Sequence, residues 1–161
     1  MKHSLHPVNA IRPTYGWVEL KSGILVQSTT DAAGFDIIYQ GPDIECPAYR
    51  LMKIPTGVVT QMAPNMVAIC KEKSSLSLKG WEVKAGVIDH HYPDEWNVIG
   101  RWVPPGPAEM DSNGGSLKIT KGMKIAQVIF LDLPSLALIG EGFRLDEVQR
   151  TGGLGSTGSH A

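Results

Sequence analysis

The feature that most constrains the fold of this chain is the frequency of its turn-forming residues. Eighteen glycines and eleven prolines are spread over 161 residues, and they cut the apolar stretches into short runs. No window keeps an apolar stripe with the 3.6-residue period of a helix. Many runs instead alternate apolar and polar residues or are rich in β-branched residues, which is typical of strands. The sequence therefore predicts an all-β fold.

Ten segments fit the strand pattern, each bounded by Gly, Pro, Asn or Asp. They are residues 17–20, 24–27, 35–39, 49–54, 58–62, 66–70, 81–84, 96–103, 116–119 and 124–132. At most one or two helical turns are expected, around residues 74–78 or 133–138. Ten short strands in a single domain of this length favour a β-sandwich or a distorted barrel of the jelly-roll type.

The overall charge limits the kinds of partner. The formal net charge is −1 and the pI is about 6.5, so a general nucleic-acid binder or membrane-surface protein is not expected. The first sixteen residues lack the apolar core of a secretory signal, and the longest apolar run, residues 125–131, is too short to span a bilayer. We therefore expect a soluble, cytoplasmic protein whose anion sites are made locally.

Two cysteines and two polar segments lie outside the strand pattern. Cys46 and Cys70 form no CxxC pair, and reduced, buried thiols are expected. Residues 104–116 are rich in Pro and Gly and fit a solvated connection better than a functional flap. Residues 150–161 fit equally a frayed terminus or a phosphate-binding arm, because glycine lets backbone N–H groups approach an anion.

Five stretches, taken in order, resemble the five motifs of the trimeric dUTP diphosphatase (dUTPase) family. They are "AAGFDI" (32–37), "IPTGVVTQMAP" running into "KEKSSLSLKG" (54–80), "AGVIDHHYPDE" (85–95), "KGMKIAQVIFL" (121–131) and "GGLGSTG" (152–158). Each motif alone is weak, but five in order within a chain of suitable length and strand content are a strong signal. The resemblance covers roughly residues 32–158.

The resemblance implies a jelly-roll homotrimer with three active sites at the subunit junctions. Residues 1–148 would form the β domain, with 1–16 as an N-terminal extension. Residues 149–161 would form a flexible Gly-rich arm, exchanged between chains, that closes a site. The implied reaction is hydrolysis of dUTP to dUMP and pyrophosphate with Mg²⁺. It would limit uracil in DNA and supply dUMP for dTMP synthesis.

The hairpin motif would carry the catalytic and sugar-binding groups. Asp89 matches the carboxylate that holds the attacking water; the alternative is an ordinary strand-end aspartate in a turn. Tyr92 matches the tyrosine that packs under the deoxyribose and excludes a 2′-hydroxyl, a role suited to a flat, rigid ring. Residues Val83, Gly86 and Ile88 would read uracil through backbone N–H and C=O groups, with Gly86 allowing close approach of the base.

Four residues match the family's phosphate-binding positions. Lys73, Ser74 and Ser75 stand where the family usually has Arg-Ser-Gly or Arg-Ser-Ser, and lysine lacks the bidentate fork of arginine. A basic, solvated turn is the alternative for this segment. Gln127 matches the glutamine that donates an amide N–H to phosphate, whereas Lys124 is expected to be a surface or interface charge.

The tail would complete the site from another chain. Its matched residues are Arg150, Leu154, Gly155, Ser156 and Thr157. Leu154 replaces the phenylalanine that usually stacks on uracil, a loss of order 1 kcal/mol. Arg150 lies one place closer to the glycine pair than is usual, which makes its γ-phosphate contact the least secure assignment.

The metal should be held largely by the three phosphates and water, as the family resemblance implies. Asp36 matches an acid placed near the metal through water or in a structural network beside Ser74, and both roles stay open. His90 and His91, adjacent on a strand, would point to opposite faces and are poorly placed to grip one ion.

Two rival functions remain, and the departures at Lys73, Leu154, His90-His91 and Pro93-Asp94 would permit the second. One is the related dCTP deaminase group, which needs a downstream glutamate where this chain reads "EWNVIG". The other is a nucleotide-sensing homologue that binds a protein partner such as a repressor. The departures also make a phage or viral origin reasonable.

Overall fold

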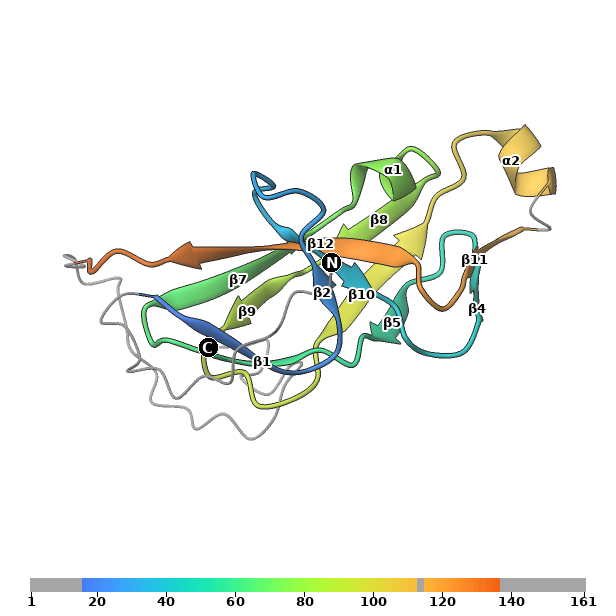
Figure 1. Cartoon of the computed structure of the whole chain (residues 1–161). Helices are drawn as coiled ribbons and strands as arrows, with labels where there is room; N and C mark the ends of the chain where they lie inside the picture. The colour runs from blue at the N-terminus through green and yellow to red at the C-terminus, as the bar shows by residue number, and fades with distance from the viewer. Residues whose placement is uncertain (1–15, 113–114, 137–161) are drawn as a thin grey trace, which may run out of the picture.

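The computed structural model describes residues 16–112 and 115–136. In that part of the chain twelve strands and two short helices form an all-β architecture, as the sequence predicts (Figure 1). Every strand pair is antiparallel. Both described helices are far too short to cross a membrane.

The largest sheet has five strands and carries most of the candidate site. Its order is β2 (Leu25–Val26), β3 (Phe35–Ile38), β12 (Lys124–Asp132), β7 (Met66–Lys71) and β9 (Val87–Asp89). The long strand β12, orange in Figure 1, lies between β3 and β7 and crosses the middle of the molecule. Segments far apart in the sequence are thereby brought side by side.

Three smaller sheets complete the fold. The three-stranded sheet has the order β5 (Met52–Pro55), β10 (Asn97–Trp102) and β8 (Trp81–Lys84). One two-stranded sheet pairs β1 (Val18–Ser22) with β6 (Val59–Met62). The other pairs β4 (Ile44–Pro47) with β11 (Ser116–Ile119). Helix α1 (Ser74–Ser77) precedes β8. Helix α2 (Pro107–Ser112) projects beside β4 and β11, at the far end of the molecule from β1 (Figure 1).

Alternating burial along the strands builds the core. In β10, Val98, Gly100 and Trp102 point inward and the residues between them are half-buried, the pattern of a strand with one covered face. Trp81, Trp96 and Trp102 are the largest fully buried side chains. Cys46 and Cys70 are free and buried, as expected, and burial raises the pKa of the Cys70 thiol to about 12.

Several predictions about local structure are wrong. Strand β4 at Ile44–Pro47 was not expected, because its proline and flanking turn residues hide a short paired segment. Residues 104–116 are not a plain loop, since helix α2 forms within them. Residues 133–136, at the start of the second suggested helical turn, are not helical; residues 137 and 138 lie outside the described part.

The segment around Ala85 and Gly86 is a connection between sheets and not a paired hairpin. Strand β8 pairs with β10, whereas β9 pairs with β7. The chain therefore leaves one sheet at Lys84 and enters the other at Val87. The expected hairpin spanning residues 83–88 is corrected accordingly.

Candidate functional site

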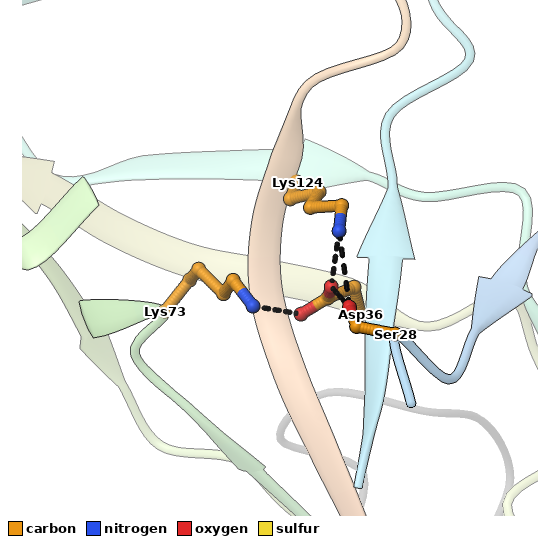
Figure 2. Close-up of polar contacts among 4 residues, drawn as sticks. All are labelled: Ser28, Asp36, Lys73 and Lys124. Atoms are coloured by element: carbon orange, nitrogen blue, oxygen red, sulfur yellow. Dashed lines mark hydrogen bonds and ion pairs between the residues drawn. The ribbon is translucent and has the colours of Figure 1, made fainter. Parts of the chain in front are cut away.

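Asp36 is a buried carboxylate at the centre of a charge network. One carboxylate oxygen, Oδ1, lies 2.8 Å from Lys73 Nζ, and the other, Oδ2, lies 2.8 Å from Lys124 Nζ. The Ser28 hydroxyl donates to Oδ2 at 2.8 Å and accepts from Lys124 at 3.1 Å. Figure 2 shows the two lysines reaching Asp36 from different elements, with Ser28 beside it. Asp36 is only 3% exposed.

These contacts keep Asp36 ionised. Burial by itself would raise the pKa of its carboxyl group, but hydrogen bonds from Lys124, Lys73 and Ser28, with the charge of Lys73, outweigh burial and hold the pKa below its ordinary value. Two cations share one carboxylate, so the cluster keeps a net positive charge. Such a cluster can attract an anion.

A β-bulge turns Lys124 toward Asp36. The register pairs Lys124 with Ile38 and Gln127 with Asp36, and it shifts between Lys124 and Ala126. In a regular strand, residues three positions apart point to opposite faces. The extra residue returns Lys124 and Gln127 to one face, since their partners on β3 are two positions apart.

Gln127 lies in a cross-strand row of polar side chains. It pairs with Asp36 on β3 and with Lys71 on β7, and directly opposite residues share a face. Lys71 is exposed and lies 3.2 Å from the Glu72 carboxylate. We call Lys71, Lys73, Lys124, Asp36 and Gln127 the charged row.

A single helical turn holds the serines next to Lys73. The Lys73 carbonyl accepts hydrogen bonds from the N–H groups of Leu76 and Ser77, both at 2.9 Å. Leu76 is buried and anchors the turn in the core, whereas Ser74 and Ser75 are exposed. Two hydroxyl groups and an ammonium group are thus presented together at one edge of the charged row.

A small cavity of about 60 Å³ gathers three of the residues predicted to bind the nucleoside. Gly86, Ile88 and Tyr92 all line it. Its remaining lining residues are Ala85, Val87, Trp96, Asn97 and Ile99. We call this the nucleoside cavity. Val83 instead lies in the core, 8% exposed, and its backbone pairs with Gly100.

Gly86 is required by the fold itself. Its φ is +114°, a conformation that L side chains rarely adopt, and a Cβ there would lie 2.5 Å from the Cys70 carbonyl oxygen. The Gly86 carbonyl accepts a hydrogen bond from the Cys70 N–H at 2.7 Å. The preceding Ala85 also has a positive φ, 61°. The close approach that the sequence suggested is therefore made by β7.

Asp89 and Tyr92 lie at the end of β9. The Asp89 carbonyl accepts the Tyr92 N–H at 3.0 Å, which closes a turn through His90 and His91. Asp89 and Tyr92 are both half-buried. The turn therefore fixes the tyrosine at the cavity and the carboxylate beside it in sequence.

The two histidines lie in a turn and not on a strand, and their rings contact each other edge-on with centroids 4.7 Å apart. The expectation that they point to opposite faces is therefore wrong. In the described residues, no group of three His, Cys, Asp or Glu side chains is arranged to hold a metal ion.

One chain does not bring Asp89 to the charged row. Asp89 pairs with Val67 of β7, whereas Gln127 pairs with Lys71. The backbones of Asp89 and Gln127 are therefore roughly 16 Å apart, because they are separated by four residues along β7, about 13 Å, and by two strand spacings, about 10 Å. The register places both on the same face, because Val67 and Lys71 are an even number of positions apart. The predicted tail residues Arg150, Leu154, Gly155, Ser156 and Thr157 lie outside the described residues.

Several features of these two regions were not predicted from the sequence. Lys124 is exposed, as expected of a surface charge, but its ion pair with Asp36 was not foreseen, and Ser28 was not considered. Trp96 and Asn97 line the nucleoside cavity. The bulge that places Lys124 leaves no pattern in the sequence, but the tryptophan next to the hairpin motif was a visible signal.

Comparisons with known proteins point to one family. A family model described as dUTPase matches residues 21–158. The deoxyuridine 5'-triphosphate nucleotidohydrolase of Mesorhizobium japonicum is 26% identical over 170 residues, covering 99% of this chain and 99% of that protein.

Solved structures show the same fold. The EIAV dUTPase matches with a TM-score of 0.64 and 26% identity, over 80% of this chain and 100% of that chain. A mutant dUTPase from Staphylococcus aureus phage phi11, whose structure shows the coordination of a structural Mg(II) ion, matches with a TM-score of 0.62 and 18% identity, over 80% of this chain and 98% of that chain. With a family model matching most of its length and all-β neighbours of this shape, the chain belongs to the dUTPase family.

Proposed function

We propose that the protein hydrolyses dUTP to dUMP and pyrophosphate by attack of water on the α-phosphorus. The observation that carries the proposal is the nucleoside cavity, where Gly86, Ile88 and Tyr92 meet around one small space. Asp89 lies on the chain between Ile88 and Tyr92. Family membership supplies the substrate class, and the cavity, about 60 Å³ in volume, supports binding of part of the base beside Tyr92.

Each candidate residue has a task that its chemistry suits. Asp89 orients the water and accepts its proton. Tyr92 packs under the deoxyribose and excludes a 2′-hydroxyl. Lys73, Ser74, Ser75 and Gln127 bind the phosphates, and the net positive charge around Asp36 favours them there. The backbone around Val83, Gly86 and Ile88 reads the base.

Magnesium would bind at this site together with the substrate phosphates. Both carboxylate oxygens of Asp36 are bound by ammonium groups, so Asp36 is better suited to act through water than as a direct ligand. Mg²⁺ commonly keeps several waters and binds through substrate phosphates. When bound, it would offset the charge of the triphosphate and of the departing pyrophosphate. The related phage phi11 dUTPase coordinates a structural Mg(II) ion.

A homotrimer with shared sites completes the proposal. A water held by Asp89 must come within about 3–3.5 Å of the α-phosphorus, but roughly 16 Å separates the Asp89 and Gln127 backbones of one chain. We propose that Asp89 of one chain works with the charged row of another, and that the 149–161 arm of a third closes the site. Arg150 would contact the γ-phosphate, Leu154 would cover uracil, and Gly155, Ser156 and Thr157 would bind phosphate.

In its cell or its host's cytoplasm, the protein would limit uracil in DNA and provide dUMP for dTMP synthesis.

The activity is tested with Mg²⁺ and each of dUTP, dCTP, dTTP and UTP, measuring pyrophosphate and ammonia. Pyrophosphate from dUTP alone is expected. Ammonia from dCTP would identify a deaminase of the same fold, and no turnover would favour a nucleotide-sensing, partner-binding homologue. In Asp89→Asn, turnover should fall by about 10²–10⁴-fold while dUMP binding survives; normal turnover would overturn the base assignment.

Subunit sharing has its own test. Asp89→Asn and Gln127→Ala should each be poorly active as pure trimers. Co-refolded mixtures should regain activity, because some sites combine an intact Asp89 with an intact Gln127. A mixture no more active than the average of its parts would contradict the sharing of sites.

A further inference from the structure

Thr56 is a buried polar residue to which the proposed function gives no role. It is 1% exposed. Its hydroxyl donates to the Trp96 carbonyl at 2.8 Å and accepts from the Val58 N–H at 3.1 Å. The Thr56 N–H donates to the same Trp96 carbonyl at 3.2 Å. Thr56 therefore ties the segment before β6 to the segment before β10, two segments that are forty positions apart in the sequence.

Two further hydrogen bonds join the same segments. The Trp96 N–H donates to the Val58 carbonyl at 2.8 Å, and the Gly57 N–H donates to the Glu95 carboxylate. We call Thr56, Gly57, Val58, Glu95 and Trp96 the clamp. Because Val58 and Trp96 are buried as well as Thr56, the clamp is anchored in the core.

The side of the clamp formed by residues 56–58 is fixed from the opposite direction too. The Ser22 hydroxyl donates to the Gly57 carbonyl at 2.7 Å. Val59, the residue after the clamp, pairs with Ser22 at the end of β1. The clamp thus holds Glu95 and Trp96 against a support that β1 keeps in place.

The clamp holds one end of the segment that carries Asp89 and Tyr92. The other end is held by β9, which contains Asp89 and pairs with β7. Only Pro93 and Asp94, two departures from the family motif, separate Tyr92 from Glu95. Proline fixes its own φ angle, so this link is short and stiff. A displacement of Glu95 is therefore passed on to Tyr92.

We propose that Thr56 and Glu95 are positioning residues for the reaction. Through the clamp they hold residues 89–95 so that Asp89 faces the attacking water and Tyr92 lies under the deoxyribose. Neither residue needs to touch the substrate. The inference rests on the proposed function and deepens it, since it assigns the selectivity against a 2′-hydroxyl to contacts outside the site as well as to the Tyr92 ring.

The test compares hydrolysis of dUTP and UTP with thermal unfolding. Two variants break the clamp: Thr56→Val keeps the shape of the side chain and removes its hydroxyl, and Glu95→Ala removes the acceptor of the Gly57 N–H. Two conservative variants, Thr56→Ser and Glu95→Gln, keep a hydroxyl and an acceptor oxygen. Glu95 is half-buried, so Glu95→Ala carries the test if Thr56→Val fails to fold.

Trp102→Phe is the control for lost stability. Trp102 is 1% exposed, and its indole N–H donates to the Lys79 carbonyl at 2.7 Å. The substitution removes a buried hydrogen bond at the other end of β10, outside the clamp. It should lower the Tm and leave the preference for dUTP over UTP unchanged.

The variants that break the clamp should lose more than stability. Thr56→Val and Glu95→Ala should lower the kcat for dUTP about tenfold to a hundredfold, because small misplacements of reacting groups are costly. The preference for dUTP over UTP, measured as the ratio of the two kcat/KM values, should fall about threefold to tenfold as Tyr92 leaves its position. Thr56→Ser and Glu95→Gln should stay close to the wild type in both quantities.

Wild-type turnover of dUTP separates failure of the inference from failure of the proposed function. If the wild type hydrolyses dUTP, but Thr56→Val and Glu95→Ala lose only Tm, the clamp is purely structural and the inference is overturned. It is also overturned if Glu95→Gln is as impaired as Glu95→Ala, because the charge of Glu95 and not its contact with Gly57 would then matter. If the wild type does not hydrolyse dUTP, the proposed function fails and the inference falls with it.

Discussion

The nucleoside cavity and the charged row are built in opposite ways. The cavity is bounded by apolar side chains and by backbone held in unusual conformations at Ala85 and Gly86. The charged row is built from ion pairs, with Asp36 bound to Lys73 and Lys124 within 2.8 Å. One region depends on shape and on a few directed polar groups, and the other on the balance of charge.

Each region is vulnerable to a different kind of substitution. A steric change should damage the cavity, because a closely packed backbone has nowhere to move. A change of charge should damage the row, because its lysines lose their shared carboxylate. Substitutions that keep shape and remove charge, or the reverse, separate the two.

The largest effect is expected from Gly86→Ala. The new Cβ would lie 2.5 Å from the Cys70 carbonyl oxygen at a φ of +114°, so strain and overpacking add to about 3–5 kcal/mol of lost stability. Urea unfolding measures this loss, and calorimetry should show weaker dUMP binding. The control is Gly122→Ala, with φ +88° and no atom within 4 Å, for which about 1 kcal/mol is expected. Equal losses would mean that contact with Cys70 is unimportant.

Asp36→Asn breaks the charged row while keeping the shape of the side chain. We expect on the order of 2 kcal/mol of lost stability. That is below the 3–5 kcal/mol of a fully buried pair, because Lys124 is 43% exposed and can turn to water. The KM for dUTP should also rise as the lysines lose their positions. Asp43→Asn is the control, since its pair with Lys118 is more than half exposed on both sides and should be worth less than 1 kcal/mol.

The pH dependence of stability gives a second measure of Asp36. Its pKa is lowered in the folded protein from 3.8, so the unfolded chain takes up the proton first as the pH falls. The contribution of Asp36 is therefore complete above about pH 4 and is lost as the pH falls through the folded-state pKa. In urea titrations, the wild type and Asp36→Asn should differ at neutral pH and converge in that acidic range. A constant difference at all pH values would assign the effect to packing.

The sequence predicted the all-β fold and most strands because each strand carries a local signal, such as the alternation of β10. Strand β4 was missed because its residues Ile44–Pro47 have no such pattern and are ordered by β11, more than sixty positions away. Helix α2 was missed because the prolines and glycines of residues 104–116, which disfavour a helix, lie mainly at the two ends of this segment. The helix forms between them.

The candidate site could be predicted from the sequence where its functional groups are polar side chains. Asp36, Lys73 and Gln127 carry polar groups at motif positions, and the structure brings them into one row. Two facts could not be read from the sequence: the bulge that turns Lys124 to Asp36, and the separate sheets joined at Ala85 and Gly86. Both are register effects, which depend on partners distant in the chain.

The smallest effect is expected from Lys73→Arg, which tests whether Lys73 serves phosphate as well as Asp36. Lys73 places one ammonium 2.8 Å from Asp36 Oδ1, whereas a guanidinium has five donors in a fork and can bind a carboxylate and a phosphate together. The KM for dUTP should fall about two- to fivefold, less than 1 kcal/mol, with little change in kcat. Lys79→Arg, at an exposed lysine just past α1, should change neither constant. An unchanged KM in Lys73→Arg would mean that Lys73 only positions Asp36, and the charged row would then bind phosphate through its other members.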